Sequence, residues 1–63
     1  MKYKYQISGC YLAGGERKYF YVEIEAEDNM QAMEIVIGNL AWKESLNGNS
    51  FYLDTIHYEI LRR

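Results

Sequence analysis

The sequence predicts a small α+β domain in which two strands are followed by one helix and a third strand. Three observations lead to this fold class: apolar alternation on both sides of Gly14-Gly15, a change of apolar period from 2 to 3.6 at Asn29, and a second alternating stretch near residue 60. A chain of 63 residues is long enough for one domain, and we assign residues 1–63 to it. Because a helix that joins neighbouring strands makes a right-handed crossover, we expect a three-stranded sheet of order 2-1-3 with the helix packed on one face.

The stretches 2–12 and 17–27 are predicted to pair as a hairpin. Gly14-Gly15 is expected to form its two-residue turn, because glycine adopts the positive φ angles that such turns need. One face then collects pairs that are apolar or set glycine beside a ring: Tyr3–Ala26, Tyr5–Ile24, Ile7–Val22 and Gly9–Phe20. The other face collects mainly opposite charges and polar groups: Lys2–Glu27, Lys4–Glu25, Gln6–Glu23, Ser8–Tyr21 and Cys10–Tyr19. Turn chemistry, apolar alternation and charge therefore predict a single register.

A helix is predicted to begin after Asp28, which can cap it together with Gln31 three residues later. It is expected to end between Ala41 and Ser45, ahead of the loop at 47–50. The face that should cover the sheet consists of Met33, Val36, Ile37 and Leu40, with Met30 and Ala32 at its margins. The last strand, from about residue 52 to 61, is expected to turn Ile56, Tyr58 and Ile60 inward and Thr55, His57 and Glu59 outward.

The composition excludes several classes of protein. One Cys and one His can make neither an internal disulfide nor a four-ligand zinc site, and we expect no metal and no cofactor. The chain has no run of about 18 apolar residues to span a membrane, and its first residues lack the apolar stretch of a signal peptide, so we predict a cytoplasmic protein. Cys10 and His57 are expected to be surface groups on a flat sheet without an orienting residue. We therefore predict no catalytic residue and no enzyme.

The helix carries the most informative pattern for function. Gln31, Ile35, Gly38 and Trp42 follow spacings of four, three and four, which places them opposite the face that covers the sheet. A domain with one helix has nothing of its own to cover that face. We interpret these four residues as a contact surface for a protein partner, including a twofold homodimer of helix against helix. The alternative is that Trp42 folds over the loop at 43–51 and packs on Phe51 or Tyr52.

A rival interpretation is a module that binds RNA or DNA. Tyr19 and Tyr21 are expected on the open face of the sheet, where exposed rings can stack on bases. The nucleic-acid site would then consist of Lys18, Tyr19, Tyr21, Arg62 and Arg63. We rank it second because the lysines of this face are matched by glutamates, and phosphate binding needs unmatched positive charge. The acidic run at 23–28 could mimic a phosphate backbone, but Glu25 and Glu27 are paired and Asp28 caps the helix, which leaves only Glu23 and Glu34. We therefore interpret the run as a solvated strand.

The order hairpin, strand into helix and closing strand, with EAEDNMQAMEIV at the junction, resembles the archaeal ribosomal protein LX family. The resemblance covers Tyr5 to Ile60 and rests on architecture and on the motif at 23–36. It implies the strand-strand-helix-strand fold. Ribosomal proteins of that kind are markedly basic after the helix, whereas residues 35–63 here are neutral and Asn-rich, so we carry over no RNA-binding residue.

Together these features predict a small non-enzymatic protein-interaction module. We expect it to self-associate and to act stoichiometrically, by occluding or assembling an unidentified protein partner. Its size and plan are those of a small accessory or inhibitor protein of a mobile element such as a phage. Nucleic acid is the alternative partner, and no membrane is expected.

Overall fold

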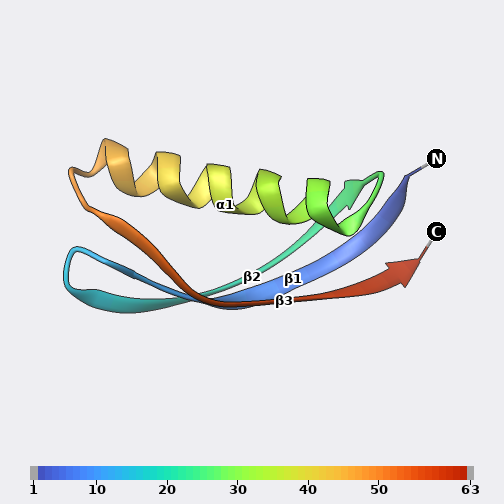
Figure 1. Ribbon diagram of the computed structural model, residues 1–63, viewed down its shortest axis with the longest axis horizontal. Coiled ribbons are helices and arrows are strands. Elements are labelled where there is room, and N and C mark those ends of the chain that lie inside the picture. Colours follow the sequence, from blue (N-terminus) through green and yellow to red (C-terminus); the bar gives the residue numbers. More distant parts are fainter. Residues whose placement is uncertain (1, 63) are drawn as a thin grey trace.

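The computed structural model describes residues 2–62 and confirms the predicted order of elements (Figure 1). β1 (Tyr3–Ala13) and β2 (Glu16–Ala26) form the hairpin, α1 (Asn29–Leu46) follows, and β3 (Phe51–Arg62) closes the sheet. The sheet is antiparallel with the order β2-β1-β3, as predicted. In Figure 1 the helix lies along one side of a strongly curved sheet.

The hairpin register is confirmed along the whole ladder, from Tyr3 opposite Ala26 to Ala13 opposite Glu16. Gly14 and Gly15 form the turn with φ angles of 59° and 81°. The predicted pair Lys2–Glu27 lies outside the two strands. Lys4 faces Glu25 across the ladder, but its ammonium lies 3.6 Å from the carboxylate of Glu23, which is two residues earlier in β2. Both groups are exposed, so this ion pair contributes little to stability.

The ladder between β1 and β3 contains two irregularities and one very close approach. A Cβ atom added to Gly9 would lie 1.9 Å from the carbonyl oxygen of Thr55, so no side chain fits at this position. Asp54 and Leu61 are the extra residues of β3 at the two shifts of register. Gly9 therefore lets β3 cross β1 closely in the middle of the sheet.

The helix begins as the capping pattern predicts. The carboxylate of Asp28 accepts a hydrogen bond from the N–H of Gln31 at 2.8 Å, and the side-chain oxygen of Gln31 accepts one from the N–H of Glu27 at 2.8 Å. The helix ends at Leu46, one residue beyond the predicted range. Gly48 follows with a φ of 76° and donates its N–H to the carbonyl of Ser45, which closes the last turn.

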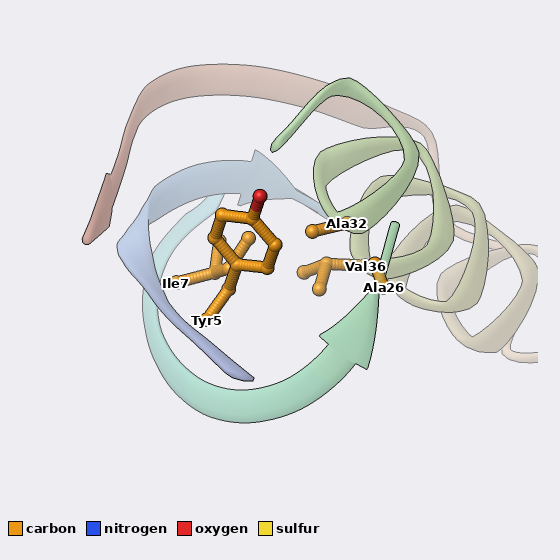
Figure 2. Packing of buried hydrophobic residues seen from close by; sticks show 5 residues of the cluster. All are labelled: Tyr5, Ile7, Ala26, Ala32 and Val36. Atoms are coloured by element: carbon orange, nitrogen blue, oxygen red, sulfur yellow. The ribbon is translucent and has the colours of Figure 1, made fainter. Parts of the chain in front are cut away.

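The core lies between the helix and the hairpin. Figure 2 shows Ala32 and Val36 of the helix directed toward the ring of Tyr5 and the side chain of Ile7. Ala32 was predicted at the margin of the covering face but is completely buried, because its small side chain allows the helix to approach the sheet closely. Around this centre pack partly buried side chains: Tyr3, Phe20, Val22, Ile24, Met33, Leu40 and Ile56.

Two side chains of β3 point inward, as predicted, but are not buried. Tyr58 and Ile60 face Ile7 and Tyr5 across the ladder, which places them on the core face. They are nevertheless 49% and 53% exposed. The helix therefore leaves the inward face of β3 uncovered near its C-terminal end.

Within residues 2–62, no helix combines the length and apolar character that crossing a membrane would require.

Candidate functional site

The outer face of α1 carries an exposed apolar row. Ile35 is 42% exposed, Trp42 67% and Leu46 68%. With Gly38 between them, these residues follow spacings of three, four and four along one face. We call this set, Ile35, Gly38, Trp42 and Leu46, the outer stripe.

Leu46 was missed from the sequence because the helix was predicted to end before it. Its spacing of four from Trp42 is the signal that would have found it. Gln31 begins the same face, but its side chain is engaged in the capping bond to Glu27. The surface that the structure offers is therefore shifted by one turn toward the C-terminal end of the helix.

The alternative placement of Trp42 is wrong. Its indole is exposed and not sealed beneath the loop that follows the helix. Phe51 packs instead against the ring of Tyr11, with the two ring centres 5.0 Å apart, and Tyr52 is exposed. Neither aromatic residue of early β3 is therefore the partner of the indole.

Gly38 forms a gap in the outer stripe. A Cβ atom added there would meet nothing within 4 Å, so its own chain gives no packing reason for glycine at this position. Glycine inside a helix costs about 1 kcal/mol relative to alanine. The gap leaves room for the backbone of a partner to approach between Ile35 and Trp42.

A buried carboxylate anchors the C-terminal end of the stripe. Glu44 is 0% exposed and accepts hydrogen bonds from the hydroxyl of Tyr11 at 3.0 Å and the amide of Asn49 at 3.0 Å. The ammonium of Lys18 lies 3.3 Å and 3.4 Å from its two oxygens. Buried charges persist only when paired and hydrogen-bonded. This Glu44 cluster (Tyr11, Lys18, Glu44 and Asn49) therefore ties α1 to β1, β2 and the loop, and fixes the helix that presents Trp42.

The electrostatics of the cluster keep Glu44 ionised. The hydrogen bond from Asn49, then those from Tyr11 and Lys18, lower the pKa of Glu44, although burial acts to raise it. Burial, followed by the hydrogen bond to Glu44, raises the pKa of Tyr11. The sequence places Glu44 on the covering face, since it lies four residues after Leu40, but it does not indicate which residues pair with the carboxylate.

The structure does not bring the residues of the predicted nucleic-acid site together on one face. Tyr19 and Tyr21 are exposed on the open face, and the hydroxyl of Tyr21 donates to Glu23 at 2.8 Å. Lys18 does not join them, because the alternation of β2 turns it toward the helix and its charge is matched by Glu44. Its assignment to one site together with these two tyrosines is therefore corrected. Arg63 and the side chain of Arg62 lie outside the described part of the chain.

Cys10 was predicted as a surface thiol and is instead buried. The β-bulge at Asp54 brings its carboxylate to 3.5 Å from the sulfur of Cys10. The guanidinium of Arg17 forms an ion pair with the same carboxylate and also lies 3.4 Å from the sulfur. Arg17, then the thiol, lower the pKa of Asp54. His57 is exposed and faces Ser8, not Cys10, across the ladder. Cys10 and His57 therefore form no dyad.

One shallow groove of about 530 Å³ lies at the hairpin tip. Its lining has no carboxylate, histidine, cysteine or cationic side chain: Leu12, Ala13, Gly14, Gly15, Gly48, Asn49, Ser50 and Tyr52. Within residues 2–62, no group of three or more His, Cys, Asp or Glu side chains is placed to hold a metal ion.

Comparison of the chain with protein-family models, with curated proteins and with solved structures finds no match. The resemblance to the archaeal ribosomal protein LX family therefore stays a prediction from the sequence. Function has to be argued from the surfaces described above.

Proposed function

We propose that this chain is a non-enzymatic protein-interaction module that binds one protein partner per chain through the outer stripe of α1. The observation that carries the proposal is the exposure of Trp42, flanked by the exposed side chains of Ile35 and Leu46. Tryptophan is enriched among the residues that dominate binding energy at protein interfaces. An exposed apolar row of this kind is typical of interaction sites.

The occupant that fits the stripe is an apolar helix of another protein. The stripe runs over residues 35–46, which is about 17 Å along a helix at 1.5 Å per residue. Gly38 leaves space for close approach of a second backbone near its middle. The Glu44 cluster holds the C-terminal end of the helix in place, so the helix loses little conformational freedom on binding.

The mode of action would be stoichiometric, in that the bound chain covers a surface of its partner. A small accessory or inhibitor protein of a mobile element, acting in the cytoplasm, is the role that this proposal favours. Self-association through the same stripe is the prediction made from the sequence, and the experiment below separates it from binding of another protein.

Binding of RNA or DNA is the second candidate. It is supported by the exposed rings of Tyr19 and Tyr21 on the open face of the sheet. It ranks lower because Lys18 is neutralised by Glu44, and Glu23 stands beside Tyr21. Phosphate contacts would have to come from unmatched cations.

Site-specific photo-crosslinking tests the proposal. A photoreactive amino acid is placed at position 42 and, as a control, at position 19, and the chain is expressed in its native cells. We expect a protein adduct from position 42 and none from position 19. The captured protein is then purified and titrated with wild-type chain, Trp42→Ala and Tyr19→Ala in a calorimeter.

We expect one partner per chain, and we expect Trp42→Ala to weaken binding by about 2 kcal/mol, roughly thirtyfold, while Tyr19→Ala leaves it unchanged. The proposal is wrong if Trp42→Ala binds as tightly as wild type. It is also wrong if the adduct at position 42 is a second copy of this chain. An RNA or DNA adduct at position 19, lost in Tyr21→Ala, would promote the second candidate.

A further inference from the structure

β3 is an edge strand whose outer side is free. In the order β2-β1-β3 it is hydrogen-bonded only to β1, and residues 57–61 are exposed throughout. An exposed edge presents main-chain donors and acceptors that another strand can pair with. Between the irregularities at Asp54 and Leu61, the stretch Ile56–Ile60 pairs regularly with β1. We call this stretch the β3 free edge.

The apolar side of the β3 free edge is continuous with the core. Ile56 packs against the buried cluster, and the ring of Tyr58 lies edge-on to the buried ring of Tyr5, with centres 6.2 Å apart. Ile60 follows on the same face and is half-exposed. A strand added beside β3 would therefore extend the core and cover side chains that α1 leaves open.

We propose that a second copy of this chain covers this edge, with β3 of the two copies pairing antiparallel about a twofold axis at Tyr58. The pairing pattern of the side chains carries the argument. A twofold axis perpendicular to the sheet makes inward side chains face inward ones, and outward side chains face outward ones. The axis must then pass between two copies of the same residue, which leaves few registers to compare.

Among these registers, the one centred on Tyr58 sets a hydrogen-bond donor opposite an acceptor, because an imidazole N–H can donate to a carboxylate. His57 of each copy then faces Glu59 of the other, while Ile56 faces Ile60 on the core side. An axis at His57 or at Glu59 would set that residue against its own copy, and two carboxylates directly opposite each other repel. An axis at Ile56 would run the ladder into the bulge at position 54.

The pairing would create one sheet of six strands with both helices on the same face. The outer stripes would remain uncovered, since they lie on the side of each helix that faces away from the sheet. The dimer therefore does not rest on the proposed partner site, and each copy would still present Trp42. Failure of one proposal leaves the other standing.

Replacement of the residues at positions 57 and 59 tests the interface. The oligomeric state of wild type, His57→Glu, Glu59→Lys and the double variant is measured by sedimentation from low to high micromolar concentration. We expect a dimer for wild type. Each single variant should weaken it about tenfold or more, because every altered contact occurs twice around the axis. The double variant should regain it, since the carboxylate introduced at position 57 would then face the ammonium introduced at position 59.

Two controls keep the outcome decisive. Glu34→Lys makes the same change of charge as Glu59→Lys at an exposed position of α1 and should leave the dimer intact. Recovery in the double variant shows that the single variants lost association and not folding. The proposal is overturned by a monomeric wild type at high micromolar concentration, by single variants that dimerise like wild type, or by a double variant that stays monomeric. Loss of the dimer in Trp42→Ala would also overturn it and assign the interface to the helix.

Discussion

The two edges of the sheet, β2 and β3, flank the same central strand and differ in what covers them. On β2 the inward side chains Phe20, Val22 and Ile24 are partly buried and pack against the core. On β3 the corresponding side chains Tyr58 and Ile60 are half-exposed. One helix is enough to shield the centre and one side of a three-stranded sheet, and the inward side chains near the C-terminal end of the other edge strand stay exposed.

The outward side chains of the two edges differ as well. Those of β2 include Glu23 and Glu25, and carboxylates on an edge strand discourage the approach of another strand. Those of the β3 free edge are His57 and Glu59, which can pair with each other across a twofold axis. The edge strand whose inward side chains the helix covers therefore also carries two carboxylates, whereas the β3 free edge carries one imidazole and one carboxylate.

The largest effect is expected where β3 crosses β1. Gly9→Ala places a methyl group against the carbonyl of Thr55, so the strands must separate, and we expect a loss of about 3 kcal/mol in the free energy of unfolding. Urea unfolding followed by circular dichroism measures it. Gly38→Ala is the matched control, because its methyl group meets open space and should stabilise the helix by about 1 kcal/mol. Equal stability of Gly9→Ala and wild type would contradict the close crossing.

The next effect separates the two ion pairs by pH. The pKa values of Glu44 and Asp54 are both lowered in the folded chain, by hydrogen bonds from Asn49 and from Arg17 respectively. Their stabilisation is therefore complete above the ordinary values of 4.5 and 3.8, and is lost as the pH falls through the folded values. We expect the urea midpoint to fall progressively below about pH 4.5.

Two variants assign this acid dependence. Glu44→Gln should remove most of it and lower stability at neutral pH, because Lys18 then loses its buried partner. Asp54→Asn should remove less, since its ion pair with Arg17 is largely exposed. A larger loss of acid dependence in Asp54→Asn than in Glu44→Gln would show that the Arg17–Asp54 ion pair, and not the Glu44 cluster, carries most of this stabilisation.

The smallest effect concerns the protected edge. Replacing Glu23 and Glu25 by threonine removes the carboxylates from β2 and favours strand formation. We expect the double variant to form larger species than wild type at high concentration, with little change in stability, as measured by sedimentation. The same replacement at the exposed Glu27 and Glu34, which lie outside β2, serves as a control for net charge. If only the control variant associates, carboxylates on β2 are not what protects that edge.

The fold could be predicted from the sequence because several local signals agreed at each element. In the hairpin, the Gly14-Gly15 turn, the apolar alternation and the charge pairs each required the register that the structure has. At the helix start, Asp28 and Gln31 form the predicted cap. These signals involve residues that are close in sequence or that face each other across a single hairpin turn, so no contact between distant segments had to be known.

The Glu44 cluster and the environment of Cys10 could not be predicted in the same way. Glutamate in a helix is solvated by default, and the burial of Glu44 depends on Tyr11, Lys18 and Asn49 from three other segments. Cys10 is covered because an irregularity in β3 brings Asp54 across it. Bulges of this kind depend on how two strands twist around each other, and the sequence pattern alone does not locate them.

The exposed position of Trp42 has a practical consequence for anyone who studies this chain in solution. It is the one tryptophan of the 63 residues, and it is largely exposed to water already in the folded chain. Its emission will therefore report poorly on denaturation, which is better followed through tyrosine signals. The same indole is an intrinsic, label-free probe for any molecule that docks on the outside of the helix.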